Sequence, residues 1–191
     1  MLTVKYINDW RLIGELTFDY PYSQEQVYLA LEQEEFLGTD SRTYCHAPKS
    51  IILQEMLDYV LKEAKRLLEE MCSLDQFKND QWHLKSTEQM TRNTVVLGSF
   101  VRDAPGFNTD IHIDSRMTVC AGMLFFNKDN DSDQATTFYS SPNPTDPIQM
   151  SSQYGKGWYA ANTAMNWHTG GNTSSRNRYA IMFTNSLNLV A

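Results

Sequence analysis

Two side chains that can bind metal, His112 and Asp114, stand two residues apart in the stretch GFNTDIHIDSRMTV, residues 106–119. The pattern DIHIDS is typical of a β-strand, in which residues i and i+2 project from the same face. A histidine and a carboxylate placed in this way can share one metal ion. Such a triplet also occurs by chance, and it then marks an exposed polar face.

A third candidate ligand, His168, follows the apolar and aromatic segment GWYAANTAMNW. It lies far enough beyond His112 for several strand-and-turn units of about 8–12 residues to return the chain to the same metal. Two histidines and one carboxylate on one face of an iron ion leave coordination positions open, as in the ferrous oxygenases. The spacing of the other histidines, His46 and His83, suggests no ligand role, and we interpret them as structural or surface residues.

An arginine, Arg178, stands ten residues after His168 in the stretch SSRNRYAIMF. Its planar, permanently charged guanidinium matches a carboxylate, so it is a candidate anchor for the far end of a dicarboxylate. Arg176 has the same strand parity and is the alternative. Either arginine could instead form a surface ion pair.

Helices are expected before about residue 80, where the apolar residues follow helical periods. Ser23 and Gln26 form a capping-box pattern at the start of a helix that Gly38 could end. A longer helix is expected over residues 48–71, whose broad apolar stripe is typical of a helix that covers a sheet.

After residue 80 the chain changes to short extended runs separated by turn-forming breaks such as DAPG and SPNPTDP. No helical period intervenes, which favours an antiparallel jelly roll or barrel over a parallel sheet. We therefore expect one mainly β domain with flanking helices, with residues 1–80 as a helical buttress and residues 81–191 as the β core. The predicted strands are QWHLKST, TVVLGSFV, DIHIDS, VCAGMLFFN, TTFYSS, GWYAANT and RYAIMFTNSL.

Composition and charge limit the partners that we expect. The 191-residue chain has a net charge of −7, which argues against nucleic acid as a partner. No secretory signal and no run of about 18 apolar residues is visible, so we expect no membrane partner. Three cysteines at wide spacings fit a reducing cytoplasm. A small molecule or a protein side chain is the expected substrate, and the sequence carries no signal of oligomeric state.

The motifs HID, MLFFN, TTFY, WHTGG and RYAIMF, together with DAPGF before the His-x-Asp triplet, resemble the 2-oxoglutarate and Fe(II)-dependent dioxygenases. The resemblance covers about residues 82–188 and is closest to prolyl-hydroxylase-like and phytanoyl-hydroxylase-like members. It implies a double-stranded β-helix, a cupin-like jelly roll. It also implies that His112, Asp114 and His168 bind Fe(II), and that Arg178 rather than Arg176 holds the far carboxylate of 2-oxoglutarate.

The implied reaction uses dioxygen to hydroxylate a C–H bond, with release of succinate and carbon dioxide. The chain departs from the family at one position, since Ala180 replaces the serine or threonine that often follows the arginine at this spacing. Another hydroxyl could substitute, and Thr118 and Tyr139 are candidates. Arg116 is a further candidate for contact with the co-substrate or a substrate anion.

Two functions of other classes remain open from the sequence. A zinc hydrolase could use the same His, Asp and His ligands with a bound water. A non-catalytic β-roll that binds a sugar or a metal is the second alternative. Neither function would require an arginine ten residues beyond the last ligand.

Overall fold

The computed structural model describes residues 1–8, 11–39, 41–80, 92–127 and 136–188. Its strands form an eight-stranded sheet, in the order β1-β2-β9-β6-β11-β5-β4-β3, and a three-stranded sheet, in the order β10-β7-β8. All recorded strand pairs are antiparallel. This mainly β architecture with flanking helices confirms the predicted fold class, the double-stranded β-helix. The strand bounds are β1 Leu2–Asn8, β2 Ile13–Phe18, β3 Leu37–Thr39, β4 Arg42–Cys45, β5 Thr94–Asp103, β6 Thr118–Phe125, β7 Thr137–Tyr139, β8 Ile148–Gln149, β9 Lys156–Ala161, β10 Trp167–Thr169 and β11 Arg178–Leu187.

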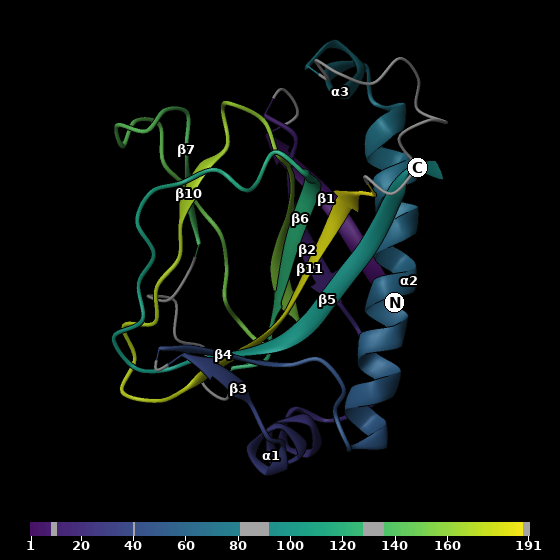
Figure 1. Ribbon diagram of the computed structural model, residues 1–191, viewed down its shortest axis with the longest axis vertical. Coiled ribbons are helices and arrows are strands. Elements are labelled where there is room, and N and C mark those ends of the chain that lie inside the picture. The colour runs from purple at the N-terminus through teal and green to yellow at the C-terminus, as the bar shows by residue number, and fades with distance from the viewer. Residues whose placement is uncertain (9–10, 40, 81–91, 128–135, 189–191) are drawn as a thin grey trace.

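The large sheet separates two layers. The long helix α2, Ile51–Ser73, lies along one face, and strands β7 and β10 of the small sheet lie on the opposite side (Figure 1). Nine buried side chains of α2 explain this packing, because they form the apolar stripe that the sequence predicts. Helix α1, Gln24–Gln33, begins at the predicted capping box of Ser23 and Gln26. A short helix α3, Asp75–Asp80, follows α2.

Side-chain alternation along the central strands divides the core into two clusters. In β6, Cys120 and Leu124 pack toward α2, while Ala121, Met123 and Phe125 pack toward the small sheet. Strand β11 alternates in the same way, so that its first residue, a buried arginine, falls on the face toward the small sheet. The space between the two sheets is where the candidate site lies.

The expectation that residues 1–80 contribute only helices is wrong. Strands β1 and β2 extend the large sheet at one end, and β3 and β4 form its other edge. The run LTVKYIN of β1 has the alternating burial of a strand with one face on the core. The signal is short, because the exposed Ile7 ends the alternation of apolar and polar residues. The strand expected at residues 81–87, with His83, lies outside the described residues.

Among the helices of the described ranges, none is long and apolar enough to cross a membrane.

Candidate metal centre

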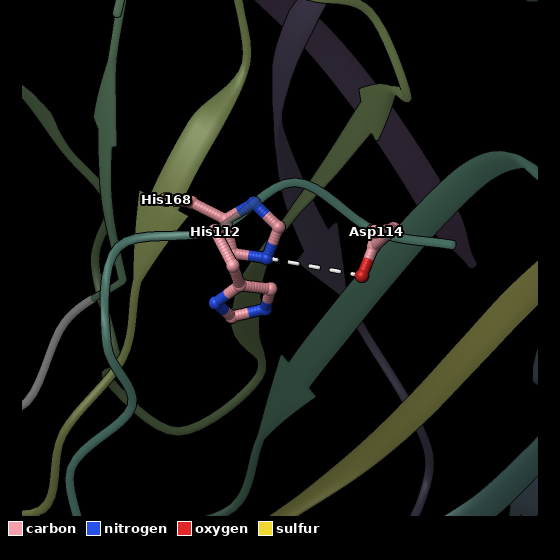
Figure 2. Close-up of side chains that lie close together, drawn as sticks. All are labelled: His112, Asp114 and His168. Carbon is pink, nitrogen blue, oxygen red and sulfur yellow. Dashed lines mark ion pairs between the residues drawn. The ribbon is translucent and has the colours of Figure 1, made fainter. Parts of the chain in front are cut away.

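His112, Asp114 and His168 lie together, as the sequence predicted. One ligand atom from each residue falls within 4.8 Å of the others. Figure 2 shows the two imidazoles side by side and the Asp114 carboxylate facing them, with Asp114 Oδ1 4.0 Å from His168 Nε2. Metal bonds to such ligands are about 2.0–2.2 Å long, so small side-chain rotations would bring all three to one ion.

Backbone contacts fix which nitrogen each histidine presents. His112 Nδ1 lies 2.8 Å from the Asp110 carbonyl oxygen, and His168 Nδ1 lies 3.2 Å from the Asn166 carbonyl oxygen. A carbonyl oxygen can only accept, so each Nδ1 must carry the proton and donate it. In a neutral ring the lone pair is then on Nε2, the atom available to a metal.

The segment around the His-x-Asp triplet is a loop, which corrects the prediction of a strand over DIHIDS. Only His112 pairs, in an isolated antiparallel bridge with His168. A side chain binds two backbone carbonyls after the triplet. Asn162 Nδ2 donates to the carbonyl oxygens of Ser115, at 2.8 Å, and Thr118, at 2.9 Å. Backbone groups satisfied in this way do not need a ladder, and the loop still places Asp114 beside both rings.

A buried network supports the loop that carries His168. Asn166 Nδ2 donates to the carbonyl oxygens of Arg11 and Ala161, both at 2.7 Å. Arg11 Nε in turn donates to the Met165 carbonyl at 3.1 Å. These contacts connect the residues just before His168 to strand β9 and to the chain that precedes β2, and they fix the carbonyl that orients the imidazole.

Burial lowers the pKa of His168 below its usual value, and this effect is opposed by the neighbouring Asp114 carboxylate and by the hydrogen bond to Asn166. The side chain is 11% exposed and lies against the rings of Phe138 and Trp158. A neutral imidazole at pH 7 is the form that binds a metal.

The three ligands line a cavity of about 90 Å³ between the two sheets. Its wall is mixed, with apolar side chains on the large sheet and threonine hydroxyls at several points. The remaining lining residues are Arg42, Thr109, Ala121, Met123, Thr136, Trp158, Gly170, Arg178, Met182 and Thr184.

Arg178 lies in the same cavity as the triad, at the start of β11, and it is 1% exposed. Its Nε and Nη2 donate to Asp103 Oδ2, at 3.0 and 2.5 Å. Burial lowers the pKa of this guanidinium, while the Asp103 carboxylate raises it. Arg176 is exposed and lines a different surface hollow, so of the two candidate arginines only Arg178 is near the triad.

Three other predicted contacts are not among the residues that line the cavity. Thr118 and Tyr139 are half-buried elsewhere, and Arg116 is exposed. Sequence reasoning missed Arg42, on β4, because it lies between the two expected helices, where no strand was predicted. It also missed Asp103, whose only signal was its place at the start of DAPGF.

No protein-family model and no curated protein matches this sequence. Solved structures do match it. A prolyl hydroxylase of Trichoplax adhaerens, solved with a peptide of hypoxia inducible factor, aligns over 92% of this chain and 84% of its own, with 13% identity and a TM-score of 0.62. A prolyl-4-hydroxylase of Pseudomonas putida aligns over 93% of each chain, with 10% identity and a TM-score of 0.58.

The chain has the fold of the 2-oxoglutarate and Fe(II)-dependent oxygenases. HygX of Streptomyces hygroscopicus, solved with nickel and 2-oxoglutarate bound, has the same fold, with 8% identity, a TM-score of 0.58, and coverage of 95% of this chain and 85% of its own. These alignments cover more of the chain than residues 82–188, so they extend into the first 80 residues. At these identities the similarity shows the fold alone, and the chemistry depends on the residues of the site.

Proposed function

We propose that this chain is an Fe(II)- and 2-oxoglutarate-dependent dioxygenase that hydroxylates a C–H bond of a small molecule or a protein side chain, releasing succinate and carbon dioxide. The observation that carries the proposal is that His112, Asp114 and His168 share one cavity with the buried Arg178. A metal triad alone would also suit a hydrolase, but a hydrolase does not need a buried cation at the other end of a small cavity.

The donor set fits ferrous iron. Two imidazole nitrogens and one carboxylate are the ligands of non-haem Fe(II) oxygenases, and a three-ligand set leaves positions for two oxygens of a 2-oxo acid and for dioxygen. When bound, the iron supplies the redox chemistry that couples oxidation of 2-oxoglutarate to oxidation of the substrate. His112 and His168 would hold it through Nε2, and Asp114 would add the single negative charge.

Arg178 would bind the far carboxylate of 2-oxoglutarate. The hydroxyl that Ala180 lacks is best replaced by Thr136, whose Oγ1 accepts from Trp158 Nε1 at 2.9 Å and keeps its own hydrogen to donate. A Cβ built on Gly170 would lie 3.6 Å from Thr136 Oγ1 and 3.9 Å from Arg178 Nη2, so both polar groups border the same space.

Apolar side chains would exclude water from the reacting end of the cavity. Phe138 packs edge-on against Trp158, with ring centroids 5.1 Å apart, and both rings contact the His168 imidazole. A dry wall strengthens the electrostatic contacts of a bound co-substrate and protects the reaction from side products.

The proposal is tested by turnover of 2-oxoglutarate. Wild-type protein supplied with Fe(II), 2-oxoglutarate and air should form succinate, and a His168→Ala variant should form none above the protein-free background. Succinate can be quantified by mass spectrometry, with a chelated sample as a further blank. Equal succinate from folded His168→Ala and wild-type protein would contradict the proposal.

A further inference from the structure

A single buried carboxylate, Asp103, lies between two arginines in the large sheet. Asp103 on β5 is the register partner of Arg178 on β11 and of Arg42 on β4. Arg42 donates through Nε to Oδ1, at 2.5 Å, and through Nη2 to Oδ2, at 2.9 Å, while Arg178 donates to Oδ2. Asp103 is fully buried, and both arginines line the cavity.

The charges of this trio decide what the far end of the cavity can bind. Arg178 paired with Asp103 alone would be electrically neutral, and a neutral pair attracts an incoming carboxylate weakly. Arg42 adds a second positive charge, so the trio carries one net positive charge. At the other end, Fe(II) and Asp114 would also leave one positive charge. A 2-oxo dicarboxylate carries one negative charge at each end, and its charges match both.

We propose that Arg42 is a co-substrate-binding residue: with Arg178 it forms a two-arginine site around Asp103 that selects 2-oxo dicarboxylates over 2-oxo monocarboxylates. This inference rests on the proposed function, and it assigns the selectivity to strand β4 as well as to β11. Because Arg42 and Arg178 sit on the two strands that flank β5, the cavity face of the sheet presents both guanidiniums together.

The setting of Arg42 fits this role. Its guanidinium lies over the Phe107 ring, 4.3 Å from the centroid, which fixes its plane. The fork to Asp103 uses Nε and Nη2, and Nη1 takes no part in it. The side chain is 18% exposed, so it has lost most of its water and its charge is only partly screened.

The alternative is that Arg42 only fastens β4 to β5. The two roles differ in what a substitution does to ligands with and without a far carboxylate. A fastening role would affect every ligand of the cavity alike, through a loosened wall. A binding role would affect 2-oxoglutarate and spare 2-oxopentanoate, which has the same chain length, the same chelating end and no second carboxylate.

The test is an anaerobic titration of the Fe(II)-loaded protein with each of these two acids, followed by the charge-transfer absorption of the chelate. Arg42→Met should raise the Kd of 2-oxoglutarate by about 10- to 100-fold, the range expected for a charge-assisted hydrogen bond. It should change the Kd of 2-oxopentanoate by less than about threefold. Fe(II) affinity, measured in the same samples, reports whether the triad is intact.

Arg102→Met is the matched control, because it removes an arginine from the same strand pair on the opposite face. Arg102 lies over the Phe36 ring and donates to Thr43, and it does not line the cavity. If Arg42→Met does not fold, Arg42→Gln decides, since its amide can still donate to Asp103 but carries no charge: relative to wild type it should raise the Kd of 2-oxoglutarate and change the Kd of 2-oxopentanoate by less than about threefold.

Equal losses for both acids in a folded Arg42 variant, or no loss for 2-oxoglutarate, would overturn the inference. An iron-loaded wild type that forms no chelate with 2-oxoglutarate would overturn the proposed function, and the inference with it.

Discussion

His112 and His168 exchange both of their backbone hydrogen bonds, with N···O distances of 3.0 and 2.7 Å. The pair holds the loop that carries His112 and Asp114 against strand β10. The centroids of the two imidazole rings lie 4.4 Å apart. The protein backbone thus sets the spacing of the two imidazoles. Ligands that are held in place before the metal arrives lose less conformational entropy when they bind it.

Loss of the Asp114 carboxylate should weaken the metal site without damaging the fold. Its side chain is 27% exposed, and we expect Asp114→Ala to lower Fe(II) affinity by at least about 100-fold, because a charged ligand is removed from the ion itself. Stability should change by less than about 1 kcal/mol. Competition with a chromophoric chelator measures the affinity.

Asp110→Asn is the control for this prediction. Asp110 is exposed and contacts His112 through its backbone carbonyl, which the substitution keeps. A similar loss of affinity in both variants would show that general negative charge, and not the Asp114 ligand, attracts the metal.

Asn162 should be a positioning residue for Asp114. Asn162→Ala would leave the carbonyls of Ser115 and Thr118 without their side-chain donor. We expect a loss of about 0.5–1.5 kcal/mol in unfolding free energy and a fall of about 10- to 100-fold in Fe(II) affinity. Urea denaturation and metal titration measure the two effects.

Asn143→Ala removes an exposed amide from a surface turn and should change neither quantity. If Asn162→Ala lowers stability and leaves the Fe(II) affinity at the wild-type value, the loop geometry does not depend on this side chain.

Gly170→Ala should act as a steric probe of the cavity. The added methyl would meet Thr136 and Arg178 at ordinary contact distances, so the fold should tolerate it within about 1 kcal/mol. The methyl group would occupy space that borders both polar groups. Because it would keep the co-substrate carboxylate from its contacts with Arg178, we expect the Kd of 2-oxoglutarate to rise about tenfold or more. Calorimetric titration of the metal-loaded variant with 2-oxoglutarate measures this Kd. A Kd equal to that of the wild type would show that the co-substrate does not bind in the space beside Gly170.

The three cysteine thiols should resist modification in the folded protein. Cys45, Cys72 and Cys120 are buried, and burial raises the pKa of each, to about 11 for Cys72. A raised pKa means less thiolate at pH 8 than in an ordinary cysteine, and the thiolate is the reactive form. Reaction with Ellman's reagent should be slow at pH 8 and complete after unfolding in guanidinium. Rapid labelling of the folded protein would contradict the burial of these side chains.

The sequence predicted the three candidate ligands because their residue types and order carry the information. The spacing of His112 and Asp114 was interpreted through a strand, whereas the structure uses a loop closed by Asn162. The hydrogen bonds that hold this loop come from the side chain of Asn162, which lies far along the chain from Asp114. The sequence around the triplet therefore does not predict them. The three side chains lie together as predicted, although the predicted local structure was wrong.

Arg42 was missed for a related reason. Strand β4 is only four residues long, and its partner β5 lies beyond α2. A short edge strand has too few alternating positions to show its period, and its pairing is set by tertiary contacts. Helix α2 was predicted well because its own apolar stripe is long enough to show the helical period.

The most direct test of the account is an anaerobic titration of the metal-free protein with Fe(II) and then with 2-oxoglutarate, monitored by visible absorption. We expect a weak charge-transfer band that saturates at one equivalent of each. His112→Ala should abolish the band, and Arg178→Ala should shift its appearance to higher 2-oxoglutarate concentration. A folded, iron-loaded wild type that shows no such band, or a band that persists in His112→Ala, would contradict the account.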